Sequence, residues 1–166
     1  MTAALPAWAE VSPKRLAHIE RVAALLAAWA DARGVAAEEK ARWLRAAWLH
    51  DALRDATVPD SLAHGPMAAD RAAAEGERDQ GILDAVRYHS VGYAGWDDVG
   101  RMLYLADFLD PDRTFDADIR ATLAARVPLG RDAVLREVVR RRIEWVVRSG
   151  WALHQETVDF WNSLVG

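Results

Sequence analysis

The sequence predicts an all-α protein in which a helical bundle forms one domain. Hydrophobic residues make up 52% of the 166 residues, and many of them are alanine, the strongest helix former. Apolar residues recur at the spacing of one helix face along most of the chain, and no useful run of alternating residues indicates a strand. The length suits a single domain with a substantial core.

The first expected helix covers residues 13–33. Ser12 is a preferred N-cap residue, Pro13 suits the first helical position, and Gly34 is typical of the residue that closes a helix. Helical spacing predicts an inward face that contains Ile19, Val22, Leu26 and Trp29. His18 lies on the same face, four residues before Val22.

A second helix is expected at residues 38–54, and it contains the stretch WLHDALRDA. Within this stretch His50 and Asp51 are adjacent on an apolar helix, so their side chains point about 100° apart. Pro59 then forces a break. The adjacent pair predicts either a core histidine beside a helix-end acid or two metal ligands.

The later helices are separated by glycine and proline. Gly76 and Gly150 each follow a helical pattern, Pro111 stops another, and residues 90–95 form a glycine-containing loop. These helices are expected at residues 64–76, 79–89, 97–109, 116–125, 131–149 and 155–164.

Composition and charge exclude several classes of protein. The net charge of −4 provides no global basic field for nucleic acid. The chain has no cysteine, which excludes disulfides and thiolate metal sites and fits a reducing compartment. The N-terminus does not resemble a signal peptide, and no apolar run approaches the ~20 residues that span a bilayer. A cytoplasmic protein without membrane or nucleic-acid partners is therefore expected.

Several polar residues fall on inward faces of the expected helices. Burying an ionised carboxylate without a partner costs several kcal/mol, about 3–5 when a buried pair is broken. One buried histidine needs no special role, but a shared cation would satisfy the whole group together. The group consists of four histidines and two aspartates: His18, His50, Asp51, His64, His89 and Asp107.

The order of these residues along the chain resembles the HD superfamily of metal-dependent phosphohydrolases in its dinuclear form. Within it, residues 13–165 are similar to the bacterial symmetrical diadenosine-tetraphosphate hydrolases (the YqeK type). The matching stretches are HIERVAALLAAWA, WLHDALRD, LAHGPMAA, ILDAVRYHSVG, MLYLADFLDPDR and LHQETVDFWN. The resemblance implies a single HD domain over residues 13–166, after an N-terminal extension of residues 1–12.

The resemblance also implies a ligand set for two divalent metal ions. His18, His50, Asp51 and Asp107 would hold one metal, and Asp51 would bridge to a second, which His64 and His89 complete. Two such metals ~3.5–4 Å apart can activate a hydroxide that attacks phosphorus. Iron is the first choice by resemblance, with Mn, Co, Ni, Zn or Mg as alternatives.

The activity implied is cleavage of dinucleoside polyphosphates, diadenosine tetraphosphate giving two ADP. The first alternative is the same chemistry on a nucleoside di- or triphosphate or a nucleotide monophosphate. The others are a di-iron oxygenase and a nucleotide-binding module without catalysis. A product screen, oxygen consumption and binding without turnover distinguish these classes.

Arginines are candidates for phosphate charge, because guanidinium pairs with phosphate in a bidentate way. Arg54 and Arg113 are expected beside Asp51 in catalysis, and Arg87 as a further substrate contact. His154 and Thr157 match the C-terminal pattern of the family and are expected as further substrate-binding residues, and Asn162 matches the asparagine of that pattern. Candidate base-stacking aromatic residues are Tyr88, Tyr93 and Trp96.

Three departures from the family pattern bear on the substrate. The segment between Asp51 and His64 is short, Arg54 stands where the family usually has lysine, and Trp161 replaces an arginine. None of them removes a metal ligand, so they bear on the nucleotide and not on the metal chemistry.

Tryptophans and a run of arginines raise the question of partners. Trp8 or Trp151 is expected to mark either a homodimer face or the core. The run Arg140-Arg141-Arg142 is expected to be a solvated helix face.

Overall fold

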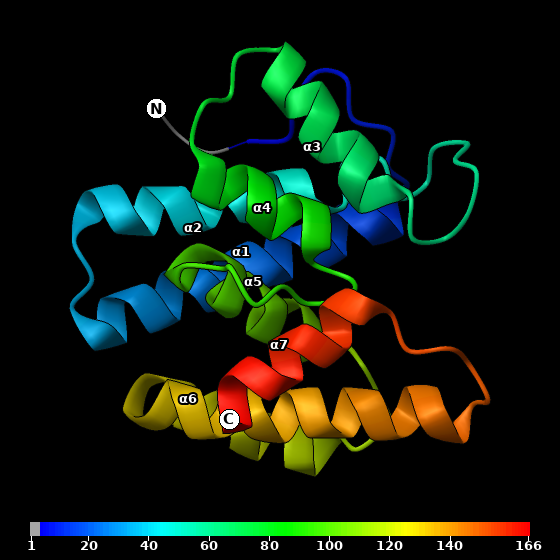
Figure 1. The fold of residues 1–166 in the computed structure, drawn as a ribbon. Helices are drawn as coiled ribbons and strands as arrows, with labels where there is room; N and C mark the ends of the chain where they lie inside the picture. The colour runs from blue at the N-terminus through cyan, green and yellow to red at the C-terminus, as the bar shows by residue number, and fades with distance from the viewer. Residues whose placement is uncertain (1–3) are drawn as a thin grey trace.

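The computed structural model describes residues 4–166, and within that range it contains seven α-helices and no strand (Figure 1). The all-α prediction is therefore confirmed. The first three residues of the expected N-terminal extension lie outside the described part of the chain. The helices are α1 Pro13–Arg33, α2 Ala37–His50, α3 His64–Ala74, α4 Gln80–Tyr88, α5 Asp98–Phe108, α6 Ala117–Arg148 and α7 Gln155–Val165.

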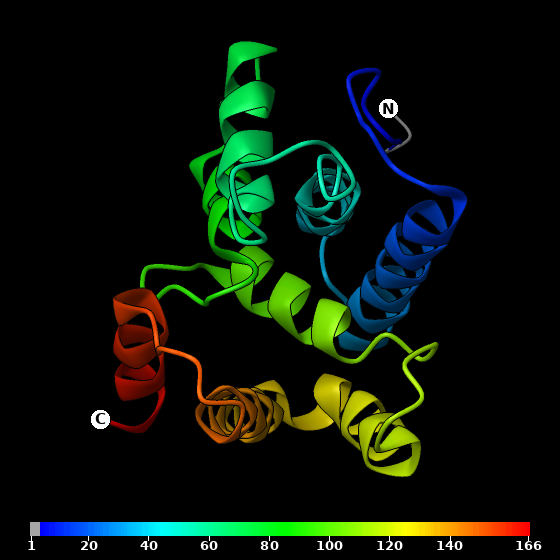
Figure 2. The same ribbon diagram turned by 90° about the vertical axis from the view of Figure 1, so that its right-hand side faces the viewer.

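Helix α5 is the centre of the bundle. It packs against α1, α2, α4 and α6, and Figures 1 and 2 show it between the α1–α4 group and α6. Its residues are apolar on nearly every side, and seven of them are buried. A helix that is apolar all round must be enclosed by its neighbours. Asp107, near its C-terminal end, is therefore brought among α1, α2 and α4.

The helix boundaries follow local signals at several ends. The Ser12 side chain accepts a hydrogen bond from the Arg15 backbone N–H at 3.1 Å, and Pro13 follows it. Gly34 has φ 65°, the left-handed conformation that glycine adopts without cost. Asp79 caps α4 by accepting from the Ile82 backbone N–H. These boundaries agree with the prediction.

Helix α2 ends at His50, whereas the sequence pattern predicts a helix to residue 54. The Ala52 carbonyl accepts a hydrogen bond from the Glu10 backbone N–H at 2.8 Å. Asp55 accepts another from the Ser12 backbone N–H at 2.9 Å. These contacts with the N-terminal segment hold residues 51–55 in turns, so tertiary contacts override the helical pattern. Asp51 is thereby released from the helix and lies beyond its last turn.

Helix α6 joins the two helices predicted at 116–125 and 131–149. The helix continues across Pro128 and bends at Gly130, which has φ −158° and ψ 59°, outside the helical region. Val127, just before the bend, is completely buried, so this part of α6 packs against the core. Figure 2 shows the two halves of α6 in different directions.

None of the helices in residues 4–166 combines the length and the apolar character needed to cross a bilayer.

Candidate metal centre

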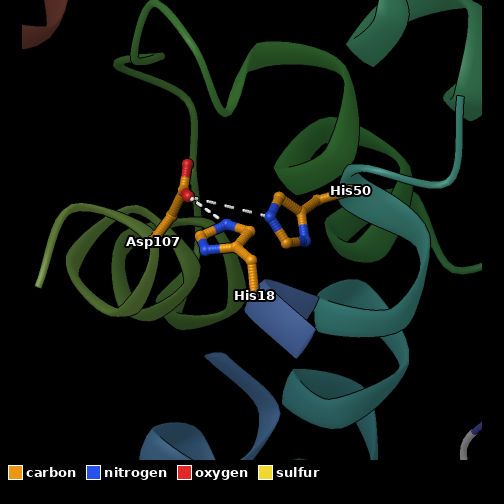
Figure 3. Close-up of side chains that lie close together, drawn as sticks. All are labelled: His18, His50 and Asp107. Carbon is orange, nitrogen blue, oxygen red and sulfur yellow. Dashed lines mark hydrogen bonds and ion pairs between the residues drawn. The ribbon is translucent and has the colours of Figure 1, made fainter. Parts of the chain in front are cut away.

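Six histidine and aspartate side chains meet where α1, α2, α3, α4 and α5 converge. His50 is the last residue of α2, His64 is the first of α3, and His89 directly follows α4. His18 comes from α1 and Asp107 from α5 (Figure 3). The four histidines and Asp51 are buried, while the Asp107 side chain is 21% exposed. The structure thus brings together all six residues of the predicted ligand set.

The six side chains form two groups of ligand atoms. His18, His50 and Asp107 offer atoms within 4.8 Å of one another, and so do Asp51, His64 and His89. In the first group the Asp107 Oδ1 lies 2.9 Å from His18 Nε2 and 3.8 Å from His50 Nε2 (Figure 3). In the second group His64 Nε2 and His89 Nε2 are 3.0 Å apart.

Asp51 lies between the two groups. Its Oδ2 is 3.6 Å from the Nε2 atoms of both His18 and His50. Its Oδ1 is 3.2 Å from His64 Nε2 and 3.3 Å from His89 Nε2. Each carboxylate oxygen therefore faces one group, which is the arrangement that a bridging ligand requires.

The surroundings of the histidines determine which ring nitrogen carries the proton. The Nδ1 atoms of His50, His64 and His89 each lie 2.6–2.8 Å from the backbone carbonyl three residues earlier. The Nδ1 of His18 lies 2.6 Å from an Asp110 carboxylate oxygen. Since a carbonyl or carboxylate oxygen only accepts, each Nδ1–H donates, and a neutral ring then keeps its lone pair on Nε2. All four lone pairs point into the centre.

This arrangement leaves unfavourable contacts that a cation would relieve. His50 Nε2 is buried and has no hydrogen-bond partner. The Nε2 atoms of His64 and His89 face each other without a proton between them if both rings are neutral. Unpaired buried polar atoms cost about 1–3 kcal/mol each. Neutral imidazoles with carboxylates form a donor set suited to Fe, Mn, Co, Ni or Zn, so the residues fit two metal ions.

The charges in the centre are strongly coupled. Burial alone would raise the pKa of Asp51, but His50, His64 and His89 outweigh it and hold the pKa well below its ordinary value. Burial would also raise the pKa of Asp107, but His18 and His50 outweigh this effect and hold the pKa well below its ordinary value. Burial lowers the pKa of His18, yet its bonds to Asp107 and Asp110 raise it overall. Both ligand carboxylates are therefore ionised, and the histidines lower their pKa when the rings are protonated, so that Nε2 carries a proton in place of its lone pair. Protons and metal ions thus compete for the same Nε2 atoms.

Asp110 is a functional candidate that the sequence analysis missed. It is 2% exposed, lies three residues after Asp107, and accepts from His18 Nδ1. Two hydrogen bonds from Arg21, at 2.7 and 3.0 Å, hold its carboxylate, and together with His18 they outweigh burial and lower its pKa to about 2. The spacing of three residues between Asp107 and Asp110 in ADFLDPDR could have indicated that the two carboxylates lie near each other.

Replacing Asp110 by asparagine is expected to weaken metal binding about 10- to 100-fold at the site that contains His18. An asparagine nitrogen can donate to His18 Nδ1 and so favour the wrong tautomer, which is how loss of an outer partner acts at metal sites. Asp112→Asn is the matched control, because Asp112 also pairs with Arg21, at 3.5 Å, but is exposed and does not contact His18. Competitive metal titration measures both, and equal affinities would contradict the assigned tautomer.

Gly65 allows α3 to approach α4 beside the second group. A Cβ at this position would lie 2.9 Å from the Val86 carbonyl oxygen and 3.0 Å from that of Arg87, which are backbone atoms and cannot turn aside. It would also lie 3.3 Å from His89 Cε1.

Gly65→Ala is therefore expected to destabilise the protein by about 1–3 kcal/mol, as overpacking of a close contact does. It should also weaken metal binding, since His64 and His89 move apart with their helices. Chemical denaturation and metal titration measure the two effects. The control is Gly34→Ala, which is strained by its φ of 65° but lies far along the chain from the ligands. Metal affinity that falls equally in both variants would contradict this role of Gly65.

A cavity of about 600 Å³ opens onto the centre. It is lined by four of the ligands, Asp51, His64, His89 and Asp107, and by five arginines, Arg15, Arg54, Arg113, Arg120 and Arg142. Arg15 lies 3.0 Å from Asp51, and Arg113 lies 3.6 Å from Asp107. Within residues 4–166, the other three arginines have no carboxylate at ion-pair distance. The cavity is therefore cationic, although the chain as a whole has a net charge of −4.

The predicted substrate contacts are only partly brought together. Arg54, Arg113, His154 and Thr157 line the cavity, and the Thr157 hydroxyl donates to the Val91 carbonyl at 2.7 Å. Arg87 is not among the lining residues and pairs with Asp70. Asn162 does not line it either.

The candidate stacking residues also lie elsewhere. Tyr88 and Tyr93 stack on each other with ring centroids 4.2 Å apart. Trp96 is buried in the core against Tyr104 and Phe160. None of the three candidates lines the cavity.

Three of the lining arginines were missed by the sequence analysis. Arg15 precedes His18 by three residues on α1, a helical spacing that was a usable signal. Arg142 belongs to the run that was expected to be solvated; Arg140 and Arg141 follow that expectation by pairing with Glu137, but Arg142 lines the cavity. Successive helix positions point about 100° apart, so one member of such a run can face inward. Nothing in the sequence around Arg120 indicates that it lines the cavity.

Comparisons with known proteins agree with this geometry. The HD domain family model matches residues 15–112. The symmetrical bis(5'-nucleosyl)-tetraphosphatase of Bacillus subtilis is 28% identical over 105 residues, 63% of this chain and 55% of that protein. The enzyme of the same name from Staphylococcus aureus is 26% identical over 104 residues, 61% and 53% of the two chains. The matched region spans about half the length of these relatives.

A solved structure has the same fold over nearly the whole chain. It is a "predicted HD superfamily hydrolase involved in NAD metabolism" from Clostridium acetobutylicum, with a TM-score of 0.77 and 19% identity. The superposition covers 93% of this chain and 90% of that one. At this identity the likeness concerns the fold alone, but the family model covers more than half of the chain and includes every predicted metal ligand. The chain belongs to the HD domain family.

Proposed function

We propose that this protein is a metal-dependent phosphohydrolase that cleaves dinucleoside polyphosphates, converting diadenosine tetraphosphate into two ADP. The observation that carries the proposal is the convergence of four Nε2 lone pairs and two carboxylates at a cavity lined by five arginines. The names of the curated relatives support this substrate. We also propose that residues 13–166 act as one HD domain, since residues from Arg15 to Thr157 line the cavity.

In this proposal the two groups hold one divalent metal ion each. His18, His50 and Asp107 with one oxygen of Asp51 would hold the first, and the other oxygen of Asp51 with His64 and His89 the second. Iron is the first candidate, with Mn, Co, Ni, Zn or Mg as alternatives. When bound, such metals supply a hydroxide nucleophile at neutral pH and withdraw charge from phosphate oxygens.

The protein's own groups bind and orient the polyphosphate. Arg54 and Arg113 lie on the cavity wall, where guanidinium can pair with phosphate oxygens through two parallel hydrogen bonds. His154 and Thr157 form another part of the wall, from α7 and the segment before it. No cysteine is present to act as a nucleophile, so attack by water fits the composition.

Arg54→Ala is expected to lower kcat/KM for diadenosine tetraphosphate about 10- to 100-fold, because a charge-assisted contact contributes about 1.5–3 kcal/mol. Arg54→Lys should recover part of the loss, since the family usually has lysine there. Arg71→Ala is the control, because Arg71 is exposed, pairs with Glu75 and is outside the cavity. If Arg54→Ala and Arg71→Ala have equal kcat/KM, Arg54 does not contact the substrate.

The proposal is tested by the products of a nucleotide panel. Anaerobically prepared protein, loaded separately with each candidate metal, is incubated with diadenosine tetraphosphate and with nucleoside mono-, di- and triphosphates. Symmetrical cleavage gives ADP alone, whereas asymmetrical cleavage gives ATP and AMP. If the tetraphosphate remains intact while a simple nucleotide is cleaved, the substrate proposal fails and HD phosphohydrolase activity on that nucleotide replaces it.

A further inference from the structure

Two exposed aromatic rings lie at the wall of the arginine-lined cavity. Phe115 and Trp151 are each 59% exposed, yet both line the cavity that contains the ligand residues. Large aromatic side chains that remain open to solvent beside a charged cavity are natural contacts for a flat, apolar ligand group. Neither ring contributes to the core, so the packing of the bundle does not account for them.

Phe115 is supported from beneath by Arg120. The Arg120 guanidinium lies 4.4 Å from the ring centroid of Phe108 and 4.1 Å from that of Phe115, so the three groups form a stack. Arg120 is buried, and it donates hydrogen bonds to the carbonyls of Phe108 and Phe115. The outer ring of the stack, Phe115, is therefore held in place while most of its surface remains open.

Trp151 is supported by Trp145. The two rings are nearly perpendicular, with centroids 4.8 Å apart, and Arg142 lies 4.7 Å from the Trp145 centroid. The Trp151 backbone N–H donates to the Val146 carbonyl at 3.1 Å, and Gly150 with φ 76° turns the chain back for this bond. Trp151 is thus also an ordered and open ring beside an arginine.

The bend in α6 brings Arg120 and Arg142 to one cavity. Arg120 and Arg142 are 22 residues apart, which is about 33 Å along a straight helix. On a straight helix the two arginines would lie far apart, but α6 bends at Gly130, and both arginines line the same cavity. Figure 2 shows the two halves of α6 in different directions. A ring therefore lies near each end of α6, with arginines and the ligand residues also on the cavity wall.

We infer that Phe115 and Trp151 are stacking platforms for the two nucleobases of the substrate, while the arginines of the cavity bind the polyphosphate that joins them. This inference rests on the proposed function and extends it by assigning the residues that recognise a substrate with an aromatic base at each end.

The test compares a ligand with bases to one without. Diadenosine tetraphosphate is tested as the substrate of the metal-loaded protein, and inorganic tripolyphosphate, which carries no base, is tested as its competitor. Trp151→Ala and Phe115→Ala should each raise the KM for diadenosine tetraphosphate about tenfold, which is within the range for loss of one stacked base. The kcat and the Ki of tripolyphosphate should remain within about twofold of the parent protein, because phosphate contacts are intact.

Two further variants separate stacking from general damage. Trp151→Phe keeps an aromatic face and should keep most of the affinity, unlike Trp151→Ala. Leu129→Ala removes an apolar side chain that is 92% exposed and outside the cavity, and it should leave both constants unchanged. A parallel rise in KM and in the Ki of tripolyphosphate would overturn the inference, since both ligands would then respond to a general change in the cavity.

Failure of the inference can be distinguished from failure of the proposed function. If diadenosine tetraphosphate is cleaved and neither alanine variant changes its KM, the inference is overturned and the proposed function stands. If it is not cleaved, calorimetric titration with ADP decides: weaker ADP binding by either alanine variant supports the platforms, and unchanged binding overturns them. If light scattering shows a dimer that Trp151→Ala dissociates with unchanged KM, Trp151 is an interface residue and the inference is overturned.

Discussion

Asp51→Ala is expected to remove metal from the protein and to lower kcat to the background of the assay. Asp51 offers one oxygen to each ligand group, so its loss takes a donor from both sites at once. It also removes a buried negative charge that offsets the positive charge of two metal ions. Metal analysis after desalting and hydrolysis of diadenosine tetraphosphate measure the two effects. Full activity in this variant would eliminate the proposed mechanism.

Asp31→Ala is the control for this experiment. Asp31 is 69% exposed, pairs with Lys40 and belongs to neither ligand group. It should keep its metal and its activity. Asp51→Asn adds a finer comparison, because it keeps one acceptor oxygen and the shape but loses the charge. Metal content that is intermediate between Asp51→Ala and the parent protein is expected for it.

The fold could be predicted from sequence where local chemistry determines the structure. Ser12, Pro13 and Gly34 mark the limits of α1 correctly, because capping depends on neighbouring residues. The predicted end of α2 at residue 54 was wrong, because residues 51–55 are held in turns by hydrogen bonds from a segment about 40 residues earlier. The two helices predicted at 116–125 and 131–149 correspond to the two halves of α6, which meet at Gly130, but the first half continues through Val127 and Pro128 beyond its predicted end.

The candidate site could be predicted from the sequence for a different reason. Its ligands are polar residues on apolar helix faces, so periodicity alone identified them as misplaced, and the resemblance supplied their grouping. The structure brings all six together, while their role as metal ligands stays a prediction. Arg120 and Arg142 could not be identified in this way, because an arginine within a helical segment is ordinary in sequence. Only the packing of α6 against the bundle brings them to the cavity.

Loss of metal is expected to lower the melting temperature by roughly 10 °C or more. A ligand present at about 1,000 times its dissociation constant stabilises the folded state by about 4 kcal/mol, and each kcal/mol shifts the melting temperature by about 2–4 °C for a domain of this size. The structural reason is the crowding of four lone pairs and two ionised carboxylates at one point, with His50 Nε2 buried and without a hydrogen-bond partner. A cation bound only by the folded chain relieves both costs. Thermal melts with metal and with excess chelator measure the difference.

Two histidine variants show whether the shift arises at this centre. His50→Ala removes a ligand and should abolish most of the metal-dependent shift. His154→Ala, which changes an exposed histidine outside both ligand groups, should leave the shift intact. Each variant loses one imidazole that could bind metal weakly in an unfolded chain, so binding to the unfolded state changes equally in both. A shift that is the same in His50→Ala and His154→Ala would mean that metal stabilises the protein elsewhere, and the centre described here would lose its thermodynamic support.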